Sequence, residues 1–251
     1  MELARSYGKV AIVTGAGRGM GKAIASHLAG VGVKVAVCDI NAENASIAAD
    51  EISSSKGEAI GIAVDVSVFS DVERMVAEVA DKLGGVDILV NNAGILYPTK
   101  FEEITPKEWQ RTIDVNLTGA FYCCKAVYPI MKENGFGRIV NISSSAGRST
   151  SDLGGAHYTV SKAGMLGLTR HLAKEGGPEI NVNAICPGII MTEMARTFGT
   201  EETLEEIRTH LPLKRLGAPK DVADLVLFLV SDASSYITGE TIEIDGGELM
   251  I

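Results

Sequence analysis

Short apolar segments rich in β-branched residues alternate with longer amphipathic segments along all 251 residues of the chain. The amphipathic segments have helical spacing, so they would join successive strands as parallel crossovers. The alternation therefore predicts an α/β fold in which helices cover both faces of a seven-stranded, mostly parallel, doubly wound sheet. The predicted strands are residues 10–13, 33–38, 59–64, 86–90, 138–142, 180–185 and 241–244.

The helical segments carry recognisable start signals. The longest is predicted over residues 105–132, where Thr105 would be the N-cap, followed by a first-turn proline and glutamate. The first helix is predicted over 20–31, and the last opens at Pro219. No linker, repeat or low-complexity segment interrupts the pattern, so residues 1–251 are expected to form one domain. The polar segment 191–217 is a candidate substrate lid, with a solvated helical hairpin as the alternative.

The acidic balance of the chain restricts its partners. With 23 basic and 32 acidic side chains, the net charge is −9, which argues against nucleic-acid and anionic-membrane binding. An anionic ligand would therefore need a local binding device. No apolar run approaches the length of a membrane span, and residues 1–9 lack a signal-peptide core, so a cytoplasmic protein is expected.

The cysteines and histidines give no sign of a metal site. None of the four cysteines has metal-ligand spacing, and the four histidines are scattered, so reduced thiols and no bound metal are expected. The cysteines are Cys38, Cys123, Cys124 and Cys186.

A glycine-rich segment follows the first predicted strand and leads directly into a helix. Residues 14–21 read Thr-Gly-Ala-Gly-Arg-Gly-Met-Gly. Glycines there permit a tight turn and let a pyrophosphate approach the backbone, while the helix N-terminus supplies amide donors. This segment is the local device that an anionic cofactor requires, although tight turns also use glycine for steric reasons alone.

An acidic side chain stands at the end of the second predicted strand. Asp39 could accept hydrogen bonds from ribose hydroxyls and would repel the additional phosphate of NADP, so NAD is favoured. Arg18 argues weakly for NADP, because a cation in this loop could pair with that phosphate. Asp65 and residues 91–94 (Asn-Asn-Ala-Gly) also fall at the predicted binding edge, where each alone could serve a turn.

The sharpest chemical signal is Tyr158 followed by Lys162. The four-residue spacing places both on one face of a helix, where a nearby positive charge favours ionisation of the phenol. Ser144 lies just after the fifth strand, at the same edge, and Asn116 lies inside the long helix, where an asparagine is unusual unless it bonds something.

Taken together, these motifs resemble the short-chain dehydrogenase/reductases from end to end. The resemblance includes the glycine loop, residues 91–94, Tyr158-x-x-x-Lys162, Pro187 with Gly188, and a C-terminal Asp-Gly-Gly at 245–247. It implies a Rossmann fold, an NAD(P)-dependent oxidoreductase acting on CH–OH groups, and a homotetramer.

The resemblance also implies roles for the catalytic residues. Tyr158 would be the general acid-base, Lys162 would lower its pKa and bind the nicotinamide ribose, and Ser144 would polarise the substrate oxygen. Asn116 would hold a water that links Lys162 to solvent. Counting from the strand start selects Ser144 as the catalytic serine, whereas counting back from Tyr158 favours Ser145; we favour Ser144.

The binding residues follow by the same matching. The cofactor would contact Gly15, Arg18, Gly19, Met20, Asp39, Ile40, Asp65, Val66, Asn92, Ala93, Gly94, Tyr158, Lys162, Pro187, Gly188, Ile190 and Thr192. The substrate would contact Ser144, Ser145, Leu153, Gly154, Tyr158, Met194 and Phe198.

The favoured function is an NAD(H)-dependent enzyme that interconverts a small secondary alcohol and a ketone by hydride transfer. The main alternative is a 3-oxoacyl-carrier-protein reductase using NADPH, which is disfavoured because an acidic enzyme would lose electrostatic steering toward an acidic carrier. A non-catalytic dinucleotide-binding protein is the alternative of a different class, but none of the four catalytic positions is altered.

Overall fold

The computed structural model describes residues 8–250 and contains a seven-stranded sheet. Residues 1–7, part of the predicted leaderless N-terminus, lie outside the described residues. The strands are β1 (Val10–Thr14), β2 (Lys34–Asp39), β3 (Ala59–Ala63), β4 (Ile88–Asn91), β5 (Gly137–Ile142), β6 (Ile180–Pro187) and β7 (Thr241–Ile244). Each of the six neighbouring pairs is parallel, so the predicted doubly wound α/β fold is confirmed and "mostly parallel" becomes wholly parallel for these strands.

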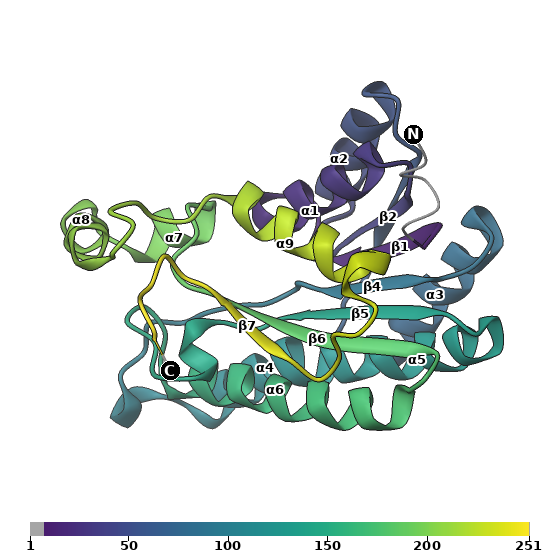
Figure 1. Cartoon of the computed structure of the whole chain (residues 1–251). Helices are drawn as coiled ribbons and strands as arrows, with labels where there is room; N and C mark the ends of the chain where they lie inside the picture. The colour runs from purple at the N-terminus through teal and green to yellow at the C-terminus, as the bar shows by residue number, and fades with distance from the viewer. Residues whose placement is uncertain (1–7, 251) are drawn as a thin grey trace.

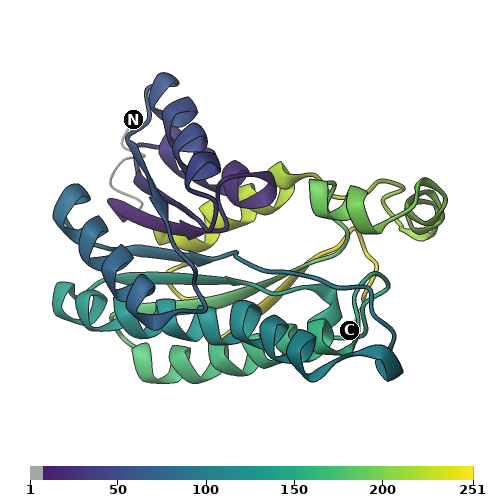
Figure 2. The same cartoon turned by 180° about the vertical axis from the view of Figure 1, so that it is seen from behind.

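Helices cover both faces of this sheet (Figures 1 and 2). One apolar core lies between the sheet and α1, α2 and α9, and a second lies between the sheet and α3, α5 and α6. Buried strands rich in valine and isoleucine are the expected interior of a parallel sheet covered on both faces. The α-helices are α1 (Gly19–Gly30), α2 (Ala42–Ser54), α3 (Phe69–Leu83), α4 (Pro106–Ile113), α5 (Gly119–Asn134), α6 (Ala156–Gly176), α7 (Glu193–Phe198), α8 (Glu201–His210) and α9 (Pro219–Val230).

The strand order places the site. The sheet runs β3-β2-β1-β4-β5-β6-β7, so the order reverses between β1 and β4. Loops after these two strands leave in opposite directions and open a crevice at the carboxyl edge, which is where doubly wound sheets bind ligands. The glycine-rich segment and residues 91–94 follow these two strands and meet there.

The predicted helix over 105–132 differs from the structure at its centre. Thr105 caps α4 by accepting a hydrogen bond from the Glu108 amide, as expected, but Asp114–Thr118 form a π-helical turn, η3, between α4 and α5. The π-helical turn contains Asn116, whose side chain bonds other parts of the fold. Isolated π-helical turns inside α-helices are frequent at functional sites.

The candidate lid segment contains two short helices, α7 and α8, which project from the carboxyl edge of the sheet (Figure 1). Its start and end are joined by a bridge between Ile190 and Gly217. Within residues 8–250, no helix combines the length and the apolar character needed to cross a membrane.

Candidate active site

The glycine-rich loop adopts backbone conformations that side chains disfavour. Gly15 and Gly19 have φ of 60° and 56°, in the left-handed region. Gly21 serves packing: a Cβ there would lie 2.3 Å from the Gly15 carbonyl oxygen and 2.5 Å from Asn92 Nδ2. The loop therefore brings the N-terminus of α1 against β1 and β4 with its amide groups toward the crevice.

Thr14 and Asn92 join this loop to the segment after β4. The buried Thr14 hydroxyl accepts hydrogen bonds from the Asn92 and Ala93 amides, each at 3.1 Å. Asn92 Nδ2 donates to the carbonyls of Thr14, at 2.9 Å, and Gly15, at 3.0 Å. Asn92 Oδ1 is buried with no partner among the described residues, so it can accept a hydrogen bond from a ligand in the crevice.

Asp39 ends β2 beside the glycine-rich loop. Its Oδ2 accepts from the Gly17 amide and its Oδ1 from the Asn41 amide, both at 3.0 Å, so the carboxylate is held in place. Arg18, the cation that could have paired with a ribose phosphate, instead pairs with Glu193 of α7 at 2.5 Å. Both side chains of that pair are exposed, so the pairing is weak in energy.

Asp65 is held by neighbours from two elements. Burial opposes its ionisation, but hydrogen bonds from Ser67 and the charge of Arg111 on α4 hold the pKa of Asp65 below its ordinary value. Arg111 Nη1 also donates to the Ser67 hydroxyl at 2.8 Å. The carboxylate is therefore ionised and fixed at the cavity wall.

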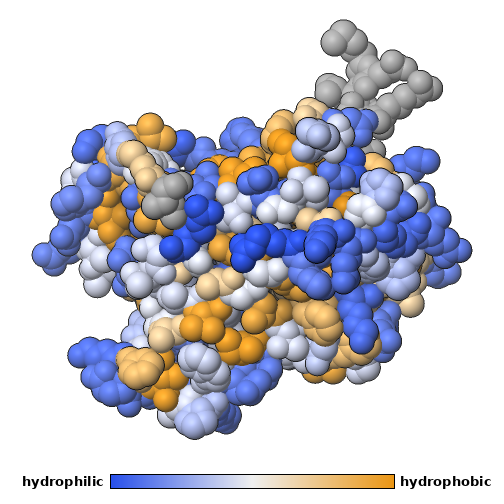
Figure 3. Space-filling model, turned by 60° about the horizontal axis from the view of Figure 1, so that its bottom comes forward, coloured by the Kyte–Doolittle hydropathy of each residue, from blue (hydrophilic) through white to orange (hydrophobic). Residues whose placement is uncertain are grey.

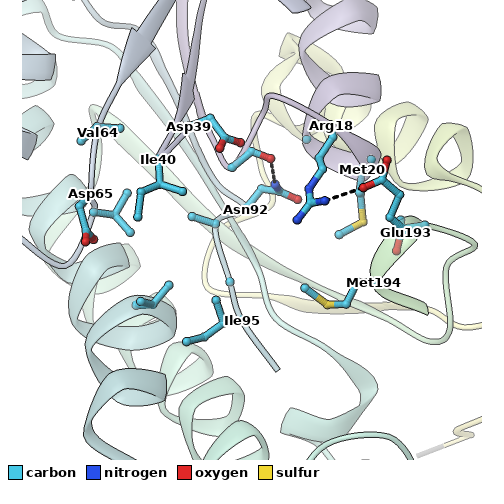
Figure 4. A pocket seen from close by; sticks show the side chains of 18 of the residues that line it. Arg18, Met20, Asp39, Ile40, Val64, Asp65, Asn92, Ile95, Glu193 and Met194 are labelled. Atoms are coloured by element: carbon cyan, nitrogen blue, oxygen red, sulfur yellow. Dashed lines mark hydrogen bonds and ion pairs between the residues drawn. The ribbon is translucent and has the colours of Figure 1, made fainter. Parts of the chain in front are cut away.

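These groups line a cavity of ≈ 280 Å³ (Figure 4). Asp65 and Ile40 lie on one side of it, and Met20, Met194 and the Arg18–Glu193 pair lie on the other. The cavity lining is Gly15, Arg18, Gly19, Met20, Gly21, Asp39, Ile40, Val64, Asp65, Val66, Asn92, Ala93, Gly94, Ile95, Arg111, Val115, Thr192, Glu193 and Met194. A helix N-terminus for pyrophosphate, a carboxylate for ribose and an unpartnered amide oxygen fit a nicotinamide dinucleotide.

Tyr158 lies in the first turn of α6, where its side chain meets Ser144. Burial raises the pKa of Tyr158 above 10.0, and the hydrogen bond from the Ser144 hydroxyl lowers it in part. The net direction is upward, so the phenol is protonated at neutral pH. Lys162, which was expected to lower this pKa, is not among the groups that shift it.

Lys162 is buried one helical turn further along α6, where the residue is 4 % exposed. Its Nζ donates to the Ile142 carbonyl at 2.8 Å and lies 5.8 Å from the centre of the Tyr158 ring. Burial lowers the pKa of Lys162 from 10.5 to about 8. The ammonium is thus still protonated near neutral pH, although its charge is poorly solvated.

Three consecutive serines after β5 have three different partners. Ser143 donates to the Lys162 carbonyl at 2.8 Å and so anchors α6. Ser144 Oγ accepts from the Ala146 amide at 3.2 Å and lowers the pKa of Tyr158 in part, whereas Ser145 lowers the pKa of Glu248 in part. This geometry favours Ser144 over Ser145 as the partner of Tyr158.

Asn116 is fully buried and all its side-chain polar groups are used. Oδ1 accepts from the Ile95 amide at 2.8 Å, and Nδ2 donates to the Ile95 carbonyl at 2.9 Å and to Ser161 Oγ at 3.0 Å. Asn116 therefore ties the segment after β4 to α6, one residue before Lys162. Any water that Asn116 holds must be held by its main chain.

His157, the neighbour of Tyr158 in the sequence, is held by contacts within the protein. It is fully buried; Nδ1 accepts from the Tyr158 amide at 3.0 Å, and Nε2 lies 2.9 Å from Glu108 Oε1. Because Nδ1 is an acceptor, Nε2 carries the proton that faces Glu108. The pair links α4 to the start of α6.

A second cavity of ≈ 130 Å³ lies beside Tyr158 and Ser144. Met20, Thr192 and Met194 line both this cavity and the first one, so the two cavities adjoin. The predicted residues that line it are Ser144, Ser145, Leu153, Tyr158, Pro187, Gly188, Ile190, Thr192, Met194 and Phe198.

Three predicted residues, Asn116, Gly154 and Lys162, line neither cavity, and several lining residues were not predicted. Gly154 packs against the Tyr158 side chain, where its amide donates to Ser151 Oγ at 2.7 Å. The unpredicted lining includes Arg111 and Glu193 of the first cavity and Leu96, Thr150, Ser151, Asp152 and Glu248 of the second. Asp152 and Glu248 have no motif spacing that could have identified them.

Comparison with known proteins gives full-length matches. The family model described as Enoyl-(Acyl carrier protein) reductase matches residues 15–248. A 3-oxoacyl-[acyl-carrier-protein] reductase of Synechocystis sp. is 43% identical over 248 residues, covering 96% of this chain and 97% of that protein. An acetoacetyl-CoA reductase of Shinella zoogloeoides is 43% identical over 248 residues, covering 97% and 99%.

A solved structure agrees. That of a 3-oxoacyl-[acyl-carrier protein] reductase with bound NAD from Brucella melitensis has a TM-score of 0.90 at 38% identity, and the match covers 98% of this chain and 92% of that chain. These matches, together with the intact Ser144, Tyr158 and Lys162, set aside the non-catalytic alternative: the protein is an oxidoreductase acting on carbonyl and CH–OH groups. It belongs to the short-chain dehydrogenase/reductase family.

Proposed function

We propose that the protein reduces a 3-oxoacyl thioester to the 3-hydroxyacyl thioester with a nicotinamide dinucleotide, NADH in preference to NADPH. The observation that carries the proposal is the placement of Ser144 and Tyr158 on the wall of one cavity that adjoins the dinucleotide cavity. The names of the relatives, which are reductases of 3-oxoacyl-carrier protein and acetoacetyl-CoA, support the carbonyl substrate over the alcohol or polyol that the sequence favoured.

The reaction consumes the 3-oxo compound, reduced dinucleotide and one proton. When bound, the dinucleotide supplies a hydride to the carbonyl carbon. Tyr158 donates its phenolic proton to the carbonyl oxygen while Ser144 donates a hydrogen bond to the same oxygen. A phenol kept protonated by burial suits this direction, because reduction requires an acid at that position.

Lys162 and Asn116 supply the charge and the frame behind Tyr158. The positive charge of protonated Lys162 would stabilise the phenolate that forms when Tyr158 gives up its proton. Its Nζ lies 3.5 Å from the position that a Cβ on Gly94 would occupy, so it would be available to hold the dinucleotide ribose. With its side chain committed to Ile95 and Ser161, Asn116 would hold the relay water through its main-chain carbonyl.

Asp39 is the residue that we propose discriminates NADH from NADPH. It is a fixed carboxylate on the cavity wall, whereas the nearby cation Arg18 is exposed and only weakly paired with Glu193. We expect wild type to bind NADH at least about tenfold more tightly than NADPH, and Asp39→Ala to reduce that ratio by about tenfold, since a charge-assisted hydrogen bond contributes about 1.5–3 kcal/mol. Calorimetric titration of both cofactors measures the ratio.

The matched control is Glu43→Ala, which removes one exposed carboxylate from the first turn of α2 without touching the cavity. It should leave the ratio unchanged. Because Asp39 also holds the Gly17 amide, its loss should weaken the binding of both cofactors. The test therefore depends on the ratio of the NADH and NADPH affinities and not on either affinity alone. Tighter NADPH binding by wild type would refute the role of Asp39.

The proposed substrate class is tested by assaying acetoacetyl-CoA. The comparison compounds are a simple ketone of about the size of the acetoacetyl group and the corresponding secondary alcohol. We expect kcat/KM for acetoacetyl-CoA to exceed that for the simple ketone by at least about 100-fold, because binding energy from the remote part of the substrate lowers the barrier. Loss of nicotinamide absorbance reports each rate. Rapid oxidation of the simple alcohol with no reduction of the thioester would contradict the proposal and support the alcohol dehydrogenase predicted from the sequence.

We also propose that the 191–217 segment covers the substrate cavity and that the protein forms a homotetramer. Met194 and Phe198 of the 191–217 segment line the substrate cavity, which supports a covering role for this segment. A homotetramer is proposed from the family resemblance, supported by half-exposed apolar side chains such as Phe121 on α5 and Val160 on α6. Figure 3 shows apolar patches among hydrophilic surface on the face that these helices form.

A further inference from the structure

The C-terminal Asp-Gly-Gly motif builds a turn that points a side chain at the substrate cavity. Gly246 and Gly247 have φ of 71° and 89°, which side chains disfavour. Asp245 closes the turn: its Oδ1 accepts from the Gly247 amide at 2.9 Å and its Oδ2 from the Leu249 amide at 2.7 Å. The next side chain, Glu248, is thereby fixed at the cavity rather than in solvent.

Glu248 shares a cavity with residues of the reacting centre. It lines the cavity together with Tyr158 and Ser144, and the Ser145 hydroxyl lowers the pKa of its carboxyl in part. Its Oε2 lies 2.8 Å from the position that a Cβ on Gly188 would occupy, so Gly188 leaves room for the carboxylate. The glycine at 188 and the turn at 245–247 therefore both serve the placement of Glu248.

The charged side chains that line this cavity are all acidic. Among the described residues that line it, Asp152 and Glu248 are acidic and none is basic. Arg148, which follows the serines, pairs with Glu243 at 3.1 Å and does not line the cavity. Burial, then Asp152 and Asp245, raise the pKa of Glu248, so the site already disfavours its negative charge.

We infer that Glu248, together with Asp152, is a specificity-determining residue that excludes substrates whose carboxylate is one methylene carbon away from the reacting ketone. A second anion in this cavity is repelled by the carboxylates of Glu248 and Asp152 and finds no cation among the described residues that line it. A thioester presents an uncharged carbonyl at the same place. The enzyme thus accepts 3-oxoacyl thioesters and rejects the corresponding free 3-oxo acids.

This inference rests on the proposed function only for the identity of the natural substrate. Two test compounds that differ in charge test it separately. Acetoacetate and methyl acetoacetate share their carbon skeleton around the ketone and differ in charge. We expect wild type to reduce the ester with a kcat/KM at least 100-fold above that of acetoacetate. Glu248→Gln, which keeps an oxygen for Ser145, should raise the acid-to-ester ratio of kcat/KM at least tenfold.

The matched control is Glu240→Gln, which removes the same charge from an exposed position before β7, outside the cavity. It should leave the ratio unchanged. An unchanged ratio in Glu248→Gln, or equal use of acid and ester by wild type, overturns the inference.

Binding separates this result from failure of the proposed function. Titration of both compounds into the complex of protein and oxidised dinucleotide measures the charge preference without turnover. If neither compound nor acetoacetyl-CoA is reduced, the proposed function fails, while preferential binding of the ester, lost in Glu248→Gln, still supports the role of Glu248. Equal binding of acid and ester by wild type would contradict that role whatever the activity.

Discussion

Tyr158→Phe should lower kcat for reduction by about 10²–10⁴-fold, the range attributed to a positioned general acid. The substitution removes the phenolic oxygen that bonds Ser144 and leaves the ring that packs against Gly154. Dinucleotide affinity should change by less than about threefold, because Tyr158 lines the substrate cavity and not the larger one. Steady-state kinetics and calorimetric titration of the same preparation measure both quantities.

A matched control is Tyr122→Phe, which removes a phenol from α5, where the ring contacts Phe69 outside both cavities. It should leave kcat within about twofold, as expected for a substitution away from the site. Retention of more than about a tenth of wild-type kcat by Tyr158→Phe would mean that another group, such as water, protonates the carbonyl oxygen.

The strands and their topology were predictable because each depends on a local pattern. Apolar strands separated by helical crossovers leave little choice but a parallel sheet, and the glycine loop identifies where the strand order reverses. The Tyr158-x-x-x-Lys162 spacing likewise places both side chains on one helix face without further knowledge of the fold.

The π-helical turn was not predictable in the same way. The side-chain pattern of residues 105–132 is continuous, and only the bonds from Asn116 to Ile95 and Ser161, distant in sequence, reveal what the altered turn accommodates. Tertiary hydrogen bonds determine where a helix departs from regular α-helical geometry, and the residue spacing within the helix does not predict those bonds.

The substrate wall shows the same limit. Ser144 and Ser145 differ by one residue, so counting along the chain left the choice open, whereas their separate partners, Tyr158 and Glu248, distinguish them. Glu248 lies 90 residues after Tyr158 and reaches the cavity only because two left-handed glycines turn the chain after β7. A sequence motif indicated the turn but not the direction of the side chain beyond it.

Lys162→Met should strongly lower activity and at the same time stabilise the fold. Burial lowers the pKa of Lys162 from 10.5 to about 8, which corresponds to a cost of about 3 kcal/mol at neutral pH. Loss of the hydrogen bond to the Ile142 carbonyl offsets about 1 kcal/mol. The free energy of unfolding at pH 7 should therefore rise by about 2 kcal/mol, while kcat falls by about 10²-fold or more because Tyr158 loses its cationic neighbour.

The pH dependence of this gain identifies its cause. Between pH 8 and 10.5 the unfolded chain binds more protons at Lys162 than the native protein does, so the free energy of unfolding contributed by this group rises with pH across that window. The stabilisation by Lys162→Met should consequently be full below pH 8 and shrink toward pH 10.5, as measured by urea unfolding at several pH values. Lys174→Met, at an exposed position of the same helix, should change stability by less than about 0.5 kcal/mol. A pH-independent gain, or a destabilised variant, would mean that the buried ammonium is better compensated by its surroundings than its single hydrogen bond to Ile142 indicates.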